Sequence, residues 1–216
     1  MNKNDTANGM AAGAAENTAG GECRTKSILL VGVGGQGTIL ASKILSEGLV
    51  RKGYDVKMSE IHGMSQRGGS VTTHVRYGSK VASPVVPEGE ADVLVAFEKV
   101  EAARWLKYLK KGGTLVVNNF EIYSLPVLTG AASMPENARE RLLEAGALLV
   151  PNTKSFNAGE IAESLGNIKA QNVVLLGALV KAMGLEDLDW HAVLAETVPP
   201  KLLELNIRAF EAGLAQ

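Results

Sequence analysis

The sequence predicts an α/β protein with a doubly wound, mostly parallel sheet and a C-terminal helical segment. An apolar run at Ser27–Val31 has no polar alternation, which is typical of a strand buried on both faces of a parallel sheet. A glycine-rich stretch and then a pattern of helical spacing follow it directly, as at the start of a βαβ unit. Farther along the chain, apolar runs and helical patterns keep alternating, and this alternation favours a doubly wound sheet.

The composition is that of a globular protein. The chain has 216 residues, of which 46% are hydrophobic and 21% charged, so it can bury a sizeable core in a single domain. A net charge of -1 provides no basic face for nucleic acid, and we expect no nucleic-acid partner. No run of about 18 apolar residues occurs, so we expect no membrane span.

The N-terminal segment differs in composition from the rest of the chain. Residues 1–24 are rich in Ala, Gly and Asn and lack the continuous apolar core of a signal peptide. We therefore expect a disordered tail over residues 1–25 and a single domain over residues 26–216.

One cysteine, Cys23, is present in the whole sequence. It has no partner for an internal disulfide, and an iron–sulfur cluster typically needs about four thiolates. We expect no metal site in this chain, so an iron–sulfur centre that works with it would belong to another chain. Sparing use of cysteine also fits a cytoplasmic protein.

The first half of the domain reads as one helix and two further strands. Thr38–Gly53 has apolar residues at helical spacing, and Val56–Ile61 is the second strand. Val71–Tyr77 alternates between two faces, with His74 and Arg76 expected on the strand surface. The nine residues between these strands are too few for a helical crossover, so we expect the third strand to pair antiparallel.

The second half continues the alternation and then becomes helical. The expected elements are a strand at Asp92–Phe97, a helix at Glu98–Leu109, a strand at Thr114–Val117, a loop at Tyr123–Pro135, a helix at Asn137–Ala145, a strand at Ala147–Val150, and helices at Asn157–Leu165, Gln171–Met183, Asp189–Glu196 and Leu202–Gly213. The pattern at Gln171–Met183 is apolar on nearly every side, which predicts a buried helix.

The first glycine stretch, GVGGQG, matches the pattern GxGxxG at Gly32, Gly34 and Gly37. Its position between a strand and a helix allows two interpretations. The glycines can let the backbone approach a phosphate or another anion at the helix N-terminus. They can also serve only to pack the strand closely against the helix, and the pattern alone does not choose between these readings.

The dinucleotide-binding fingerprint is incomplete. It needs an acidic residue at the end of the second strand, about 20 positions after the first glycines, to bind a ribose. Glu60 is 28 residues after Gly32, and Asp55 precedes the second strand. A free-standing NAD(P)-binding Rossmann-like protein therefore remains only an alternative.

Polar groups gather on the loop after the second strand, in EIHGMSQRGG from Glu60. In an open parallel sheet ligands bind beyond the carboxyl ends of the strands, so we expect this loop and the glycine loop to be neighbours there. Phe97-Glu98, Asn118-Asn119 and Pro151–Thr153 are expected at the same edge. The candidate site residues are Gly32, Gly34, Gly35, Gln36, Gly37, Glu60, His62, Gln66, Arg67, Gly68 and Gly69. Alternatively, Glu60 can cap a neighbouring helix, and His62 and Arg67 can be ordinary surface residues.

No complete catalytic set is recognisable. The sequence has no nucleophile elbow, no zinc-ligand spacing, no P-loop and no Cys–His pair. A sheet edge that suits a ligand, in a chain that lacks a catalytic set, indicates a subunit. Such a subunit would complete a site whose cofactor lies in another chain.

Three stretches together resemble a known family. GVGGQG after a strand, EIHGMSQRGGSVTTHVR and EADVLVAFEKVEAARW are similar to the gamma-type domain of 2-oxoacid:ferredoxin oxidoreductases, in particular to the branch that acts on indolepyruvate. The resemblance covers about Lys26–Gly213 and includes the ending NIRAFEAG. GGQG combined with SQRGG is far more specific than GxGxxG alone.

The resemblance implies an oxidoreductase subunit that is inactive alone. The complex would decarboxylate indolepyruvate or another arylpyruvate oxidatively, transfer the acyl group to coenzyme A and reduce ferredoxin. Thiamine diphosphate and the iron–sulfur clusters would lie on the large (alpha) partner subunit, and the two loops would face that partner and the substrate or coenzyme A. Pyruvate, 2-oxoglutarate and branched 2-oxo acids remain alternative substrates, and a non-enzymatic scaffold remains an alternative function.

Overall fold

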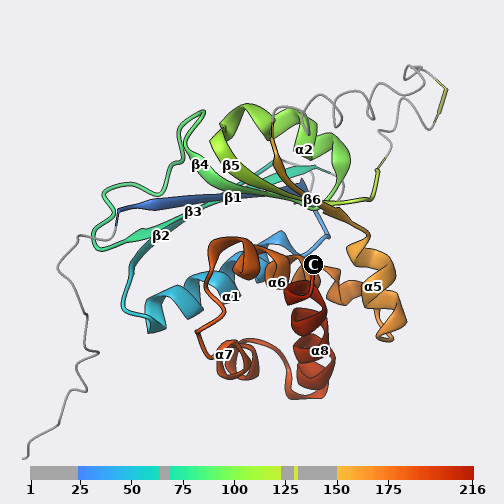
Figure 1. Ribbon diagram of the computed structural model, residues 1–216. Helices are drawn as coiled ribbons and strands as arrows, with labels where there is room; N and C mark the ends of the chain where they lie inside the picture. The colour runs from blue at the N-terminus through green and yellow to red at the C-terminus, as the bar shows by residue number, and fades with distance from the viewer. Residues whose placement is uncertain (1–23, 64–68, 123–128, 131–149) are drawn as a thin grey trace, which may run out of the picture.

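The computed structural model describes residues 24–63, 69–122, 129–130 and 150–216. The expected tail over residues 1–25 lies almost wholly outside the described residues, as do the expected helix Asn137–Ala145 and most of the expected strand Ala147–Val150. The described residues form a layered α/β structure in which a central sheet has helices on both faces (Figure 1). The predicted fold class is confirmed.

The described part of the chain contains one six-stranded sheet, with the strand order β2-β3-β1-β4-β5-β6. The strands are β1 (Lys26–Val33), β2 (Asp55–His62), β3 (Ser70–Gly78), β4 (Ala91–Ala96), β5 (Leu109–Asn118) and β6 (Asn152–Phe156). The strands β1, β4, β5 and β6 pair parallel, whereas β3 pairs antiparallel with both β1 and β2. Consequently β2 runs in the same direction as β1, and the carboxyl ends of five strands lie at one edge.

The helices are divided between the two faces of the sheet. They are α1 (Thr38–Arg51), α2 (Lys99–Trp105), α5 (Ala158–Ser164), α6 (Gln171–Met183), α7 (Trp190–Thr197) and α8 (Leu203–Leu214), with short 3₁₀ turns at Leu106–Tyr108, Ile168–Ala170 and Pro200–Leu202. Figure 1 shows α2 above the sheet and α1, α6, α7 and α8 below it. Among the described residues, no helix combines the length and the apolar character that crossing a bilayer requires.

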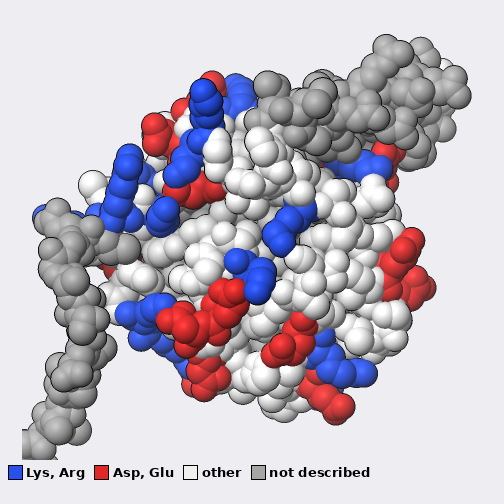
Figure 2. Space-filling model, in the orientation of Figure 1, with Lys and Arg blue, Asp and Glu red and all other residues white. Residues whose placement is uncertain are grey.

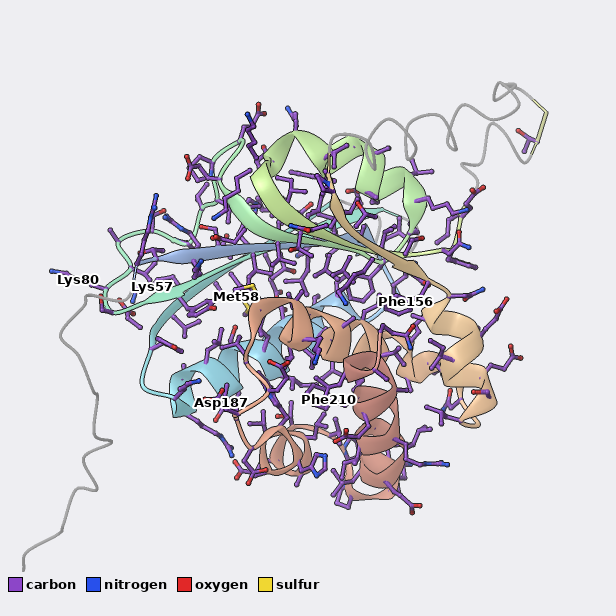
Figure 3. All side chains as sticks on the ribbon, in the orientation of Figure 1. Lys57, Met58, Lys80, Phe156, Asp187 and Phe210 are labelled. Carbon is purple, nitrogen blue, oxygen red and sulfur yellow. The ribbon has the colours of Figure 1, made fainter. Side chains whose placement is uncertain are left out.

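Each face of the sheet has its own apolar core. The larger core joins β1 and β4 to α1, α6, α7 and α8, and the smaller one packs under α2. The helix α6 is buried from Asn172 to Val180, as its all-round apolar pattern predicts. It crosses α8 so closely that a Cβ on Gly177 would lie 2.2 Å from the Phe210 carbonyl oxygen. The two helices are therefore in direct backbone contact. Phe210 lies inside the helical layer in Figure 3.

Three predicted elements differ from the structure in their bounds. The helix expected at Glu98–Leu109 ends at Trp105, and β5 already begins at Leu109 rather than at Thr114. The last strand is Asn152–Phe156 and runs parallel to β5. Pro151–Thr153, expected in a loop at the carboxyl edge, therefore lie at or just before the start of β6, away from that edge. Its polar sequence, NTKSF, carries no apolar signal because β6 is an edge strand that the backbone pairing with β5 holds in place.

The expected surface position of His74 is also wrong. Its side chain is only 4% exposed, beneath the segment 79–90. Its Nδ1 accepts a hydrogen bond from the Val86 N–H at 3.1 Å, and Arg76 donates to the carbonyl oxygens of Ser83 and Val85. Strand alternation correctly shows which face these side chains share, but it cannot show that a later loop covers that face.

Candidate functional site

The two loops singled out in the sequence meet at the carboxyl edge of the sheet. The Gly34 N–H donates to the Gly69 carbonyl oxygen at 2.8 Å, which joins the glycine loop to the end of the second loop. The base of the second loop is closed by a 3.2 Å hydrogen bond from the Gly63 N–H to the Ser70 carbonyl oxygen. The prediction that these segments are neighbours is therefore confirmed, and the topology explains it because β1 and β2 end at the same edge.

The glycine loop delivers the N-terminus of α1 to this edge. Gly37 adopts a φ of 81°, a left-handed conformation that L side chains rarely adopt, and α1 begins at the next residue. No described side chain caps this end, and the first turn of α1 holds no acidic residue. The N–H groups of the first turn therefore present a partial positive charge that suits an anion.

An open cleft of about 480 Å³ lies between the two loops. This volume is within the range of small-molecule sites. Its described lining consists of Gly34, Gly35, Gly37, Thr38, Ile39, His62 and Val71. Ile39 is 47% exposed, and His62 is the titratable side chain among these lining residues. The cleft thus offers an apolar wall, a helix N-terminus and one imidazole.

The candidate residues fall into three groups by position. Gly34, Gly35, Gly37 and His62 line the cleft, and Gly69 joins the two loops. Glu60 is partly exposed in β2, at a position opposite Thr73. Gln66, Arg67 and Gly68 lie outside the described residues.

The remaining two candidates, Gln36 and Gly32, are turned into the protein. The Gln36 Oε1 accepts a hydrogen bond from the Val33 N–H at 2.8 Å, and its Nε2 donates to the Phe97 carbonyl oxygen at 3.1 Å. Gly32 lies within β1, and a Cβ there would be 2.7 Å from the Gln36 Oε1 and 2.9 Å from the Phe97 Cβ. Close packing therefore explains Gly32, whereas Gly34 and Gly35 face the cleft.

The Gln36 side chain occupies the crevice in which a Rossmann-type protein would bind a dinucleotide. The helix after β1 packs below the sheet and the helix after β4 packs above it, so the topological switch point lies between these strands. The side chain of Gln36 bridges that point. In addition, β3 separates β2 from β1, so Glu60 is about 10 Å away in strand spacing. The alternative reading as an NAD(P)-binding protein is not favoured.

Buried amides, which sequence reasoning assigned no role, hold the edge together. Asn118 is fully buried at the end of β5, where its Nδ2 donates to the Phe97 carbonyl oxygen at 3.2 Å and its Oδ1 accepts from the Ala158 N–H at 2.9 Å. Asn172 donates from α6 to the Gly37 carbonyl oxygen at 3.3 Å. The position of Asn118 at a strand end was a usable signal, but Asn172 is hidden in an apolar helical pattern.

Two buried carboxylates, one at the N-cap of α2 and one in its first turn, lie beside the same edge. Glu98 is 1% exposed and caps α2 by accepting hydrogen bonds from the Val100 and Glu101 N–H groups. Burial raises the pKa of Glu98. The hydrogen bonds from these N–H groups act in the opposite direction, and the neighbouring Glu101 charge raises the pKa further. Glu101 is 2% exposed. Neither side chain is among the described residues that line the cleft.

The described residues offer no ligand set for a metal ion, and the sequence offers none for an iron–sulfur cluster. No group of three or more His, Cys, Asp or Glu side chains occurs among them. The sequence also has only one cysteine, which is too few for an iron–sulfur cluster. The described part of the chain thus combines a cleft at the carboxyl edge with no recognisable catalytic set.

Such a domain defines a class of protein: an α/β subunit that works with another chain. The chain belongs to the pyruvate ferredoxin/flavodoxin oxidoreductase family, whose pattern matches residues 27–216. The indolepyruvate oxidoreductase subunit IorB of Thermococcus kodakarensis is 41% identical over 194 residues, which cover 87% of this chain and 94% of that protein.

Solved structures share the fold. The gamma subunit of a keto/oxoacid ferredoxin oxidoreductase from Geobacter sulfurreducens superposes with a TM-score of 0.63 at 26% identity, over 88% of this chain and 96% of that chain. The 2-oxoglutarate:ferredoxin oxidoreductase of Magnetococcus marinus, solved with 2-oxoglutarate, coenzyme A and succinyl-CoA bound, superposes with a TM-score of 0.65 at 19% identity. The shared region covers 88% of this chain and 30% of that longer chain, so the same fold also occurs as one part of a larger polypeptide.

Proposed function

We propose that this chain is the small subunit of an indolepyruvate:ferredoxin oxidoreductase and that its carboxyl-edge cleft receives coenzyme A. The complex would oxidise and decarboxylate indolepyruvate or another arylpyruvate and release the acyl-CoA, with ferredoxin as the electron acceptor. The observation that carries this proposal is the cleft itself, formed where the glycine loop meets the second loop, in a domain that holds no described catalytic set.

The chemistry of the cleft suits coenzyme A. The uncapped N-terminus of α1 provides N–H groups for a phosphate, and the apolar wall at Ile39 and Val71 suits the pantetheine chain. His62 adds an imidazole at the rim. The name of the Thermococcus relative supports indolepyruvate as the substrate, and the Magnetococcus structure supports coenzyme A as a ligand of such complexes.

The redox cofactors would belong to the large subunit. Thiamine diphosphate supplies the carbanion chemistry of 2-oxo acid decarboxylation when it is bound. This chain offers one cysteine and no described acidic cluster, so its residues fit neither an iron–sulfur cluster nor the metal that accompanies a diphosphate. We expect the isolated chain to be inactive and, because it uses cysteine sparingly, to work in the cytoplasm.

Reconstitution with the large, cysteine-rich subunit tests the activity. We expect the complex to reduce a redox dye with indolepyruvate only when coenzyme A is present, and we expect neither subunit alone to do so. A panel of pyruvate, 2-oxoglutarate, phenylpyruvate and indolepyruvate assigns the substrate. A higher kcat/KM for 2-oxoglutarate or pyruvate than for the arylpyruvates would contradict the assignment to indolepyruvate.

A charge placed in the cleft tests the binding site. Ile39→Glu puts a carboxylate beside the N-terminus of α1, where it competes with an anionic ligand, and we expect the KM for coenzyme A to rise about tenfold. The matched control is Val50→Glu on the same helix, because Val50 is similarly exposed (54%) but lies near the opposite end. Equal KM values for the two variants would place the coenzyme A site elsewhere.

A further inference from the structure

A buried carboxylate on α2 contacts the root of the second loop. The Glu101 side chain is 2% exposed, and its Oε2 accepts hydrogen bonds from the Ser70 hydroxyl at 2.7 Å and from the Trp105 indole N–H at 3.0 Å. Its Oε1 pairs with the Arg104 guanidinium at 2.5 Å. Trp105 and Arg104 follow Glu101 by four and three positions on the same helix, so Ser70 is the partner among these that belongs to the sheet.

Burying a carboxylate in this way is costly unless hydrogen bonds compensate for the lost water. A helix that needed only to pack on the sheet would be served by an apolar residue at this position, because an apolar residue carries no desolvation penalty. The hydrogen bond between Glu101 and Ser70 links α2 to the first residue of β3 and so restricts how α2 can shift across the sheet.

Ser70 stands at the junction of both loops. Its carbonyl oxygen accepts the Gly63 N–H and closes the base of the second loop, and the preceding Gly69 accepts the Gly34 N–H of the glycine loop. Val71, the next residue, lines the cleft, as Ile39 does. The hydroxyl of Ser70 thus links a buried anion to the backbone that connects the two walls of the cleft.

We propose that Glu101 is a positioning residue that acts through Ser70 to hold Gly69, the described end of the second loop, against the glycine loop and so sets the width of the cleft. Neither Glu101 nor Ser70 is among the residues that line the cleft. The Glu101 carboxylate accepts a hydrogen bond from the Ser70 hydroxyl. The Ser70 carbonyl oxygen accepts one from the Gly63 N–H, and the Gly69 carbonyl oxygen accepts one from the Gly34 N–H. The functional consequence rests on the proposed binding of coenzyme A in this cleft.

Hydrogen exchange in the full-length chain tests the positioning directly. The Gly34 and Gly63 amides report the two contacts, because each donates across the junction, and the Phe97 amide, which donates to the Val31 carbonyl oxygen between β4 and β1, is the internal control. In Glu101→Gln and in Ser70→Ala we expect exchange of the Gly34 and Gly63 amides to accelerate about tenfold, with Phe97 unchanged. Unchanged exchange at Gly34 and Gly63 would overturn the inference.

Two further variants separate positioning from general stability. Ser70→Thr keeps the hydroxyl and is expected to retain slow exchange. Arg104→Gln removes the partner of Oε1 but leaves the bond between Oε2 and Ser70, so it is also expected to exchange like the unsubstituted chain. If Glu101→Gln does not fold, Ser70→Ala carries the test alone, because it alters a partly exposed hydroxyl and leaves the carboxylate in place. Fast exchange in Arg104→Gln would show that α2 packing, rather than the Ser70 bond, holds the loop.

The reconstituted complex gives the functional readout. We expect Glu101→Gln and Ser70→Ala to raise the KM for coenzyme A about fivefold to tenfold while kcat changes less than about twofold, because the loop acts in binding rather than in chemistry. Faster exchange together with an unchanged KM for coenzyme A would support the positioning role but contradict the coenzyme A assignment of the cleft. A loss of kcat with an unchanged KM would overturn the proposed route through the cleft.

Discussion

The carboxyl edge of the sheet and the opposite, amino edge, where the parallel strands begin, are stabilised by different kinds of side-chain interaction. At the carboxyl edge, polar side chains are buried and bond to backbone groups, as Gln36, Asn118 and Asn172 do. At the opposite edge, charged side chains pair with one another in solvent, as Lys52 does with Asp187 at 2.7 Å. In Figure 2 many lysine and arginine side chains lie toward the end where β1 begins, which is where Lys57 and Lys80 are labelled in Figure 3.

This difference indicates that substitutions at the carboxyl edge cost more stability than substitutions at the amino edge. A buried amide that loses its partner leaves unsatisfied groups in a medium of low dielectric constant, whereas an exposed ion pair that is broken regains water. The carboxyl edge therefore tolerates little change, and this rigidity keeps the walls of the cleft in place. At the amino edge, where ion pairs such as Lys52–Asp187 are exposed, we expect substitutions to cost less.

The largest expected effect is that of Gly37→Ala. Gly37 has a φ of 81°, and an added Cβ would lie 2.6 Å from the Asn172 Nδ2, so the substitution strains the backbone and displaces a buried amide. We expect a loss of about 3 kcal/mol in the free energy of unfolding, measured by urea denaturation. The matched control is Gly53→Ala at the other end of α1, where φ is 87° but no atom lies within 4 Å, and the expected loss is about 1 kcal/mol. Equal losses would contradict the contrast between the edges.

A smaller loss is expected for Asn118→Ala. The substitution removes the acceptor of the Ala158 N–H and a donor to the Phe97 carbonyl oxygen, and both groups are then left buried without that partner. We expect a loss of about 2 kcal/mol in the free energy of unfolding. Asp187→Asn, which breaks an exposed pair whose aspartate side chain is 67% exposed, is expected to cost about 0.5 kcal/mol or less. The comparison fails if the two substitutions have the same cost.

The smallest effect concerns His74, midway along β3 between the two edges. Burial lowers the pKa of His74 below its ordinary value of 6.5. The unfolded chain therefore binds this proton at pH values where the folded chain does not, so the stability that the neutral imidazole contributes is fully present above pH 6.5 and is lost as the pH falls toward the lowered pKa.

His74→Asn tests this dependence, because an asparagine oxygen can take the place of Nδ1 as the acceptor of the Val86 N–H while removing the titration. We expect the free energy of unfolding of the variant to fall less steeply between about pH 7 and pH 5 than that of the unsubstituted chain. Parallel pH profiles would show that His74 is not the group that titrates.

Several features of the site follow from local sequence. The apolar run before GVGGQG specifies a buried strand, and the glycines specify a sharp turn into a helix. The short gap before Val71–Tyr77 correctly predicts an antiparallel strand. These features place two polar loops at one edge of the sheet because strands that run in the same direction end together.

Other features depend on contacts between distant residues. The alternation of β3 places His74 on one face, but burial by the segment 79–90 depends on a loop that forms later in the chain. Likewise, Gln36 looked like a ligand-facing residue in a glycine-rich pattern, and only the approach of Phe97 from β4 turns its side chain inward. The strand β6 exists because β5 offers a free edge to it.

The sequence by itself determined the order of the elements, the parallel character of the sheet and the two loops at its carboxyl edge, because hydrophobic periodicity and glycine conformation act over a few residues. The tertiary structure alone decided which polar groups face the cleft and which hold it together. The contacts of Gln36 with Phe97, of Asn172 with Gly37 and of Glu101 with Ser70 join residues 31 to 135 positions apart. Such contacts form only when the packed core brings these elements together, and no local pattern records them.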